Sequence, residues 1–294
     1  MTDLEGRPPR SWLVISVAAI GGAVLAAVLT VGFSTSGEDD PMRDAAADPS
    51  PTTTTPTPTP SASETAPDPR LLPNMRSLTP RNITIRPSGT GLSLRFDGTL
   101  ANVGVGPLEV VPDNEKPCPR GQRHASQSIY RDANGNARFD AGVDRQTALR
   151  PGGCLLFHPE HTHWHLDASA SYALTAAEDD AVVVEQNKVS FCLRDNERVP
   201  GVEAPARDGN GYGKCARDRI QGISSGWADV YAAKLPGQEL KLPRAMPDGV
   251  YCLRVDADPL DLLLESDEGD NAEVRAITIT GRQVGPATPE SCSR

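Results

Sequence analysis

Residues 91–100 read GLSLRFDGTL, a pattern typical of a β-strand. Leu92, Leu94, Phe96 and Leu100 all fall at even positions, so in an extended chain they share one face. Similar short stretches, separated by Gly and Pro, occur at 82–86, 108–111, 126–131, 182–193, 249–256 and 273–281. Helical periodicity is scarce, and residues 194–226 lack periodicity of either kind, which is typical of a functional loop. We therefore expect a mainly β domain, an antiparallel sandwich or Greek key that carries long functional loops.

The chain before this domain has a different composition. Residues 12–33 are almost entirely apolar and long enough to cross a hydrocarbon core of roughly 30 Å as a helix. Two arginines precede this segment and three acidic residues follow it, which places residues 1–11 in the cytoplasm and the rest outside. We expect a single-pass membrane anchor; the alternative is a cleaved signal peptide, which would make the protein secreted. Residues 34–69, rich in Pro, Thr and Ser, are predicted to be a disordered linker.

The remaining residues, 70–294, are enough for one domain with a sizeable core. All six cysteines lie in it, and an even count in an exported chain predicts three disulfides. Pairing between sequence neighbours would give Cys118–Cys154, Cys192–Cys215 and Cys252–Cys292. The net charge of −10 argues against nucleic acid as a partner and is compatible with cationic ligands.

A histidine cluster is the first sign of chemistry. Residues 158–165 read HPEHTHWH and hold four of the five histidines in the chain. On an extended strand His161, His163 and His165 would share one face, while Trp164 would point to the opposite, apolar side. Three neutral imidazoles suit copper, zinc or iron and leave coordination positions open. His158 lies three residues before this triad.

Three further motifs follow the histidines. Residues 188–195 read KVSFCLRD, residues 221–231 read QGISSGWADVY, and residues 265–271 read ESDEGDN. Together with HTHWH at 161–165, and in this order, they resemble the catalytic domain of the lysyl oxidase family in its bacterial form. The clear part of the resemblance covers about residues 150–275. Residues 70–115 match more loosely, and residues 1–69 do not match.

The resemblance implies a copper site at His161, His163 and His165. It also implies that Lys188 and Tyr231 become joined as lysine tyrosylquinone, a cofactor made from the chain itself. The activity implied is oxidation of a primary amine, with peptidyl lysine as one candidate, to an aldehyde, with oxygen consumed and ammonia and hydrogen peroxide released. Asp229, two residues before Tyr231, is our candidate for the general base, and ordering of the loop is its alternative role.

An acidic segment near the C-terminus offers oxygen ligands for a hard cation. The resemblance implies a structural calcium site, whose residues would be Glu265, Asp267, Asp270 and Asn271, joined by Asn74 and the Met75 carbonyl. A polar turn without metal is the alternative for this segment. Residues 132–140 also carry alternating oxygen side chains, but Val143 stands where a calcium loop of the EF-hand type needs Glu, and an Asn-Gly hairpin turn explains the segment more simply.

Two rival functions use the same histidines. One is a catalytically inactive, copper-binding cell-surface protein of the same fold. The other is a zinc hydrolase with three histidines and a bound water. The hydrolase would leave Lys188 and Tyr231 without a role, so an extracytoplasmic copper amine oxidase is the function we expect.

Overall fold

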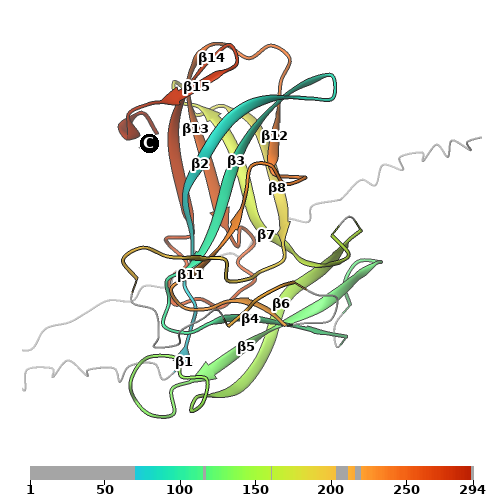
Figure 1. Ribbon diagram of the computed structural model, residues 1–294, viewed down its shortest axis with the longest axis vertical. Helices are drawn as coiled ribbons and strands as arrows, with labels where there is room; N and C mark the ends of the chain where they lie inside the picture. The colour runs from blue at the N-terminus through green and yellow to red at the C-terminus, as the bar shows by residue number, and fades with distance from the viewer. Residues whose placement is uncertain (1–69, 115–116, 160, 203–210, 216–219, 293–294) are drawn as a thin grey trace, which may run out of the picture. The chain divides into compact units, whose positions relative to one another are not determined.

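The computed structural model describes residues 70–114, 117–159, 161–202, 211–215 and 220–292, and these residues form β-strands and one short 3-10 helix (Figure 1). The elements are β1 (Arg70–Leu71), β2 (Met75–Ser88), β3 (Gly91–Asn102), β4 (Leu108–Asp113), β5 (Gln122–Arg131), β6 (Arg145–His158), β7 (His163–Ala176), β8 (Val182–Phe191), β9 (Glu197–Arg198), β10 (Gln221–Ile223), β11 (Trp227–Tyr231), β12 (Glu239–Leu242), β13 (Gly249–Ala257), β14 (Ala272–Thr280), β15 (Gln283–Pro286) and η1 (Pro289–Cys292). The segments predicted at 1–11, 12–33 and 34–69 lie outside the described residues. Among the described residues, no helix has both the length and the apolar character to cross a bilayer.

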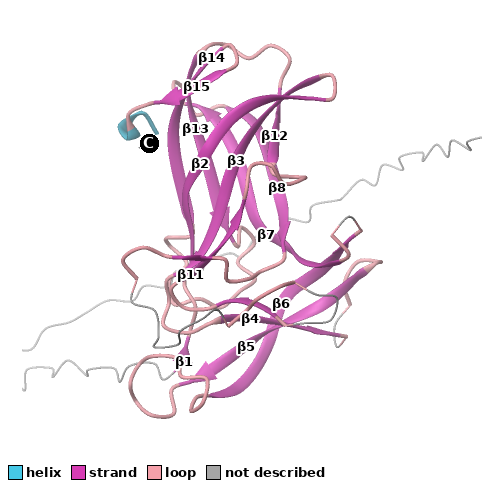
Figure 2. Cartoon of the chain, in the orientation of Figure 1, coloured by secondary structure: helices cyan, strands magenta, loops and turns pink. Residues whose placement is uncertain are grey.

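The strands form two antiparallel sheets (Figure 2). The larger has ten strands in the order β10-β4-β5-β6-β7-β13-β14-β15, with β1 paired to β5 and β8 paired to β7. The smaller has five strands in the order β12-β3-β11-β9, with β2 paired to β3. This confirms the mainly β, antiparallel class; the Greek-key connectivity stays a prediction.

Strand β3 carries the core of the smaller sheet, as its sequence pattern predicted. Leu94, Phe96 and Leu100 are almost fully buried, and Leu92 packs against them. Phe96 meets Tyr172 of β7 edge to face, with ring centroids 4.8 Å apart, so the two sheets share one hydrophobic core. The alternation is not complete, because Ser93, Asp97 and Thr99 between them are buried as well.

Strands β6 and β7 determine where the histidines lie. They pair only through four residues at the end of β6 and four at the start of β7, from Leu155↔Leu166 to His158↔His163. Beyond this short ladder β6 continues alongside β5 and β7 alongside β13. The histidine segment therefore sits at the point where the ten-stranded sheet changes direction (Figure 1).

All three predicted disulfides are confirmed. Cys118 bonds to Cys154, Cys192 to Cys215, and Cys252 to Cys292. The second disulfide follows β8 directly and fixes the segment that contacts Tyr231, while the third fastens η1 to β13. Each bond closes a loop that the unfolded chain would otherwise leave open, which reduces the entropy of the unfolded state.

Candidate metal and cofactor site

Three imidazoles converge at the junction of β6 and β7. His165 Nε2 lies 3.1 Å from His163 Nε2 and 3.2 Å from His161 Nδ1. Within the described part of the chain, these three side chains form one group whose ligand atoms could reach a single ion. A second such group combines His163 with Cys192 and Cys215, but both sulfurs are already joined to each other. The nitrogen triad is thus the group that the structure offers to a transition metal.

The backbone conformation that brings the three histidines together differs from the extended strand predicted for them. Strand β7 begins only at His163, and Thr162 before it adopts a left-handed conformation with φ of 60°. His161 therefore reaches the cluster from a turn, while His163 and His165 share a face of the strand. The prediction of one continuous strand through all three histidines is wrong, because a sharp turn between β6 and β7 is needed to pair the two strands.

The electrostatics of the triad suit metal binding. Burial lowers the pKa of His165 to about 3, and burial together with His161 lowers the pKa of His163. Both rings are therefore neutral near pH 7, with a lone pair available. His165 Nδ1 lies 3.1 Å from the Ser190 carbonyl oxygen, a contact that assigns the proton to Nδ1 and leaves Nε2 facing the other two histidines.

His158 and Trp164 frame the triad. The His158 ring stacks on His161, with centroids 4.0 Å apart, and on His165 at 4.9 Å. Its Nδ1 is buried and makes no hydrogen bond. Trp164 is half-buried on the opposite side of the strand, edge to face with Phe157 and packed against the core, as predicted from the alternation.

Tyr231 lies at the end of β11 with its ring stacked on Phe191, and the two centroids are 3.8 Å apart. The Cys192 backbone N–H donates to its hydroxyl oxygen at 2.6 Å, and the hydroxyl lies 3.3 Å from the Cys192 carbonyl. Burial raises the pKa of Tyr231 well above its ordinary value, and the Asp229 carboxylate raises it further. Tyr231 lines the same cavity of about 100 Å³ as His158, His161 and His165, so two histidines of the triad and one predicted cofactor residue share it.

Lys188 lies in β8, but the structure describes only its backbone, and the predicted role of its side chain falls outside the described atoms. Gln186 and Val189, on either side of it in the chain, line the cavity that contains Tyr231. The strand that carries Lys188 is therefore part of the cavity wall.

Asp229 is fully buried next to this site. Its Oδ1 accepts a hydrogen bond from Asn196 Nδ2 at 2.9 Å and lies 4.0 Å from Arg194 Nε, while its Oδ2 is buried without a hydrogen-bond partner. Burial raises the pKa of Asp229 well above its ordinary value, against the opposing effect of Arg194. Asp229 is not among the side chains that line the Tyr231 cavity. Its contacts order the segment after β8, and its role as general base stays a prediction.

Sequence reasoning missed three side chains around Tyr231. Phe191 supplies the stacking ring, and Tyr172 donates its hydroxyl to Gln238 Oε1 at 3.1 Å. Gln238 also lines the cavity. A Cβ at Gly98 would lie 2.7 Å from the Tyr172 hydroxyl, so glycine is required for this close approach. Each contact joins residues far apart in the chain, and a single sequence carries no signal for them.

Some of the predicted cation ligands, Asn74, Asp270 and Asn271, lie near Glu265, which is 5% exposed, and Met75 contacts Glu265 through its N–H and not through its carbonyl. Glu265 Oε2 accepts the Met75 N–H, and Oε1 accepts from Asn271 Nδ2 at 3.3 Å. The Asn74 amide donates to Asp270 Oδ2 at 3.3 Å. Three oxygens of this cluster are buried without a hydrogen-bond partner, namely the Oδ1 atoms of Asn74, Asp270 and Asn271.

Glu265 shows the cost of that burial. Burial raises its pKa to about 8, and the carboxylates of Glu268 and Asp258 act in the same direction. A buried carboxylate among unpaired oxygens is an arrangement that a bound cation would stabilise. Asp267, in contrast, is exposed and accepts the Gly269 N–H at 2.8 Å, so the structure does not bring it into the cluster.

The loop at 132–140 contains no unpaired buried oxygen. Asp132 accepts the backbone N–H groups of Asn134, Gly135 and Ala137, and these bonds lower its pKa. The predicted Asn-Gly hairpin turn is not formed, because a longer loop, residues 132–144, separates β5 from β6 and is ordered by turns of this Asx type.

Comparison with known proteins agrees with the geometry of the site. The family model described as lysyl oxidase matches residues 135–287. Lysyl oxidase homolog 1 of Homo sapiens is 30% identical over 176 residues, which cover 58% of this chain and 29% of that protein. Protein-lysine 6-oxidase of Rattus norvegicus is 32% identical over 133 residues, 45% of this chain and 30% of that protein. Each of these two matches spans less than a third of the relative. The family match at 135–287 contains the histidine triad, β8 and β11. On the extent of the family match, this chain belongs to the lysyl oxidase family.

Proposed function

We propose that the protein is a copper-dependent amine oxidase that converts primary amines to aldehydes with a quinone cofactor derived from Lys188 and Tyr231. The overall reaction takes R–CH₂–NH₂, O₂ and H₂O to R–CHO, NH₃ and H₂O₂. The observation that carries the proposal is that His161, His165 and Tyr231 line one cavity, with Phe191 stacked on the tyrosine ring. The relatives named protein-lysine 6-oxidase and lysyl oxidase homolog support this class of reaction.

The residues of the triad fit a copper ion. His161, His163 and His165 would hold it through neutral nitrogens, and the Ser190 carbonyl would fix the orientation of His165. Copper, when bound, supplies the one-electron and oxygen chemistry that no side chain can perform, and the quinone supplies an electron sink for the amine. The cavity provides a buried setting in which Phe191 keeps the Tyr231 ring in one orientation and Cys192 holds its hydroxyl.

The net charge of the chain and the name of one relative support primary ammonium compounds as the substrate class. A net charge of −10 raises the local concentration of ammonium ions at the protein surface. Peptidyl lysine, the substrate class in the name of the rat relative, and small primary amines both carry that group. We propose both as substrates. We also propose that the enzyme acts outside the cytoplasmic membrane, to which residues 12–33 would anchor it.

We further propose that the Glu265 cluster binds calcium and stabilises the fold. The unpaired oxygens of Asn74, Asp270 and Asn271, together with the raised pKa of Glu265, support a hard cation at this position. Glu265 lies in the loop after β13 and Asn74 immediately before β2, so a cation would join segments from the two sheets.

The test of the oxidase is reaction of copper-loaded, aerobically incubated protein with phenylhydrazine, followed by a coupled peroxide assay with a panel of primary amines. We expect a visible-absorbing adduct and amine-dependent peroxide, and both should disappear in Tyr231→Phe. The matched control is Tyr251→Phe, because the Tyr251 hydroxyl bonds to the Pro247 carbonyl and does not line the Tyr231 cavity. An inactive copper-binding protein would give no adduct and no peroxide, and X-ray fluorescence would reveal zinc in place of copper if the site were hydrolytic.

A further inference from the structure

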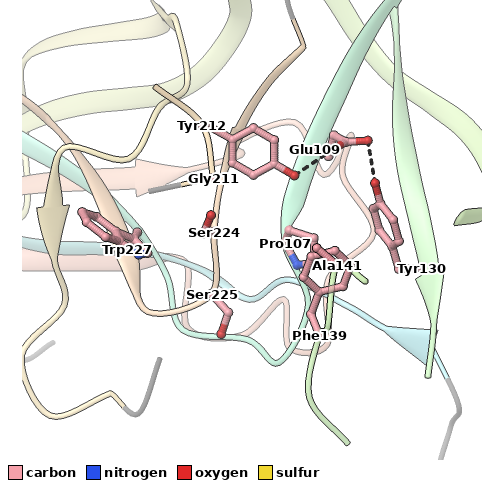
Figure 3. A pocket seen from close by; sticks show the side chains of 10 residues that line it. All are labelled: Pro107, Glu109, Tyr130, Phe139, Ala141, Gly211, Tyr212, Ser224, Ser225 and Trp227. Atoms are coloured by element: carbon pink, nitrogen blue, oxygen red, sulfur yellow. Dashed lines mark hydrogen bonds between the residues drawn. The ribbon is translucent and has the colours of Figure 1, made fainter. Parts of the chain in front are cut away.

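A second pocket, of about 230 Å³, lies away from the histidines and has a distinct chemical character (Figure 3). Its walls include four aromatic rings, Tyr130, Phe139, Tyr212 and Trp227, and one carboxylate, Glu109. The volume is below the range of roughly 300–1,000 Å³ that is usual for drug-sized ligands. The pocket therefore suits one side chain or one small molecule.

Glu109 is held in place by the two tyrosines. Tyr212 donates its hydroxyl to Glu109 Oε2 at 2.9 Å, and Tyr130 donates to Oε1 at 2.9 Å, as Figure 3 shows. Burial and the Glu109 charge raise the pKa values of both tyrosines, so the phenols stay protonated and act as donors. A carboxylate has about four lone-pair sites, and these two bonds use two of them. Glu109 can thus accept further hydrogen bonds from a ligand.

The pocket has one charge and it is negative. Among its ten described lining residues, Glu109 alone is charged. Aromatic faces attract cations as well, and Tyr130 and Phe139 meet edge to face with centroids 4.8 Å apart. Arg198 already stacks over the Trp227 ring at 4.6 Å, so the other three rings are the ones open to a ligand. An anion would be repelled, and a neutral apolar ligand would cover the Glu109 carboxylate without offering it an opposite charge.

The walls are built independently of any ligand. Asp195 accepts the N–H groups of Gly211 and Tyr212 at 2.8 and 3.1 Å and the Ser224 hydroxyl at 2.7 Å. Gly222 is needed behind the Tyr212 ring, because a Cβ there would come within 2.8 Å of it. Such preorganisation lowers the entropic cost of binding.

We propose that this pocket binds an alkylammonium group, such as a lysine side chain, at a site separate from the triad cavity. Trp227 and Tyr231 are four residues apart on β11, which places their Cα atoms about 13 Å apart along the strand, and the two pockets share no lining residue. The binding needs neither copper nor quinone, so it goes beyond the proposed oxidase function and stands or falls separately from it.

The test is isothermal titration calorimetry of the full chain carrying Tyr231→Phe, which cannot form the quinone and so cannot capture the amine covalently. The ligands are n-butylammonium, Nα-acetyl-lysine methylamide, n-butanol and butyrate. We expect saturable binding of the two ammonium compounds with Kd of the order of 1 mM or tighter. Equal affinities would identify the ammonium group as the ligand, and tighter binding of the lysine derivative would identify a peptidyl lysine.

Two substitutions locate the binding. Glu109→Gln should weaken it about tenfold or more, because a charged hydrogen bond is replaced by a neutral one. Phe139→Leu should weaken it several-fold by removing a ring while keeping an apolar side chain. The control is Glu290→Gln, which removes an exposed carboxylate that does not line this pocket. Equal binding of butanol, no saturation in the millimolar range, or unchanged affinity in both folded pocket variants would overturn the proposal.

Discussion

Replacing Glu265 with Gln should stabilise the metal-free protein, although Glu265 is a proposed ligand. Burial raises its pKa to about 8 from 4.5, so near pH 7 the folded carboxyl is mainly protonated while the unfolded one is ionised. At 1.36 kcal/mol for each pH unit, this difference costs about 3 kcal/mol at pH 7. The Gln side chain avoids this cost but loses the bond from Asn271 Nδ2, a loss of about 1 kcal/mol. The net gain is about 2 kcal/mol, or roughly 4–8 °C in Tm.

The stability difference between Glu265→Gln and the parent should depend on pH. A carboxyl whose folded pKa is raised binds more protons when folded, so the contribution of Glu265 to stability is fully present below about pH 4.5 and is lost as the pH rises to about 8. Thermal unfolding of metal-free protein should therefore show Glu265→Gln above the parent at pH 7.5 and close to it at pH 5.

Calcium should reverse the order of the two proteins. The ion pairs with the ionised carboxylate of the parent, whereas the Gln variant offers only a neutral oxygen and should gain less stability. The control is Glu273→Gln, which changes a carboxylate hydrogen-bonded to Thr79 outside the cluster. The reasoning fails if the variant is no more stable than the parent without metal at pH 7.5, or if calcium raises the Tm of both equally.

Three further experiments test the triad and the residues around Tyr231. His165→Ala should reduce the copper bound to the protein, measured by mass spectrometry, to near zero. The control is His124→Ala, which should bind copper as the parent does, because His124 contacts Asp113 and lies outside the triad. Equal copper in both variants would exclude the triad as the copper site. Asp229→Asn should lower amine oxidation about tenfold or more if Asp229 is the base, while a normal rate would assign it to loop ordering. Phe191→Leu should cost about 1–2 kcal/mol in chemical denaturation through the lost stack on Tyr231, and unchanged stability would show that the ring is not packed as described.

The sequence predicted those strands in which large apolar residues alternate with polar ones. Leu94, Phe96 and Leu100 gave the core of β3 directly, and β13 and β14 were predicted within a residue at each end. Strand β7 was missed because small residues, Ala168, Ser169 and Ala170, occupy its buried middle, and the left-handed conformation of Ala168 interrupts the alternation there. A sequence pattern reveals a strand only where large apolar residues alternate with polar ones, and the middle of β7 lacks such an alternation.

The residues that could bind a metal were predicted from the sequence, but their arrangement in space was not. His163 and His165 share a strand face as the spacing predicts, whereas His161 depends on a turn that only the pairing of β6 with β7 imposes. The stack of Phe191 on Tyr231 and the convergence of two tyrosines on Glu109 join distant segments. Such contacts follow from the closed fold and have no local signature.

Peptide mass spectrometry of the protein after aerobic incubation with copper tests whether Lys188 and Tyr231 form the quinone. We expect a cross-linked species that joins the peptides containing Lys188 and Tyr231, present in the parent and in Tyr251→Phe and absent in Tyr231→Phe. Recovery of both peptides unmodified from copper-loaded parent protein would contradict it.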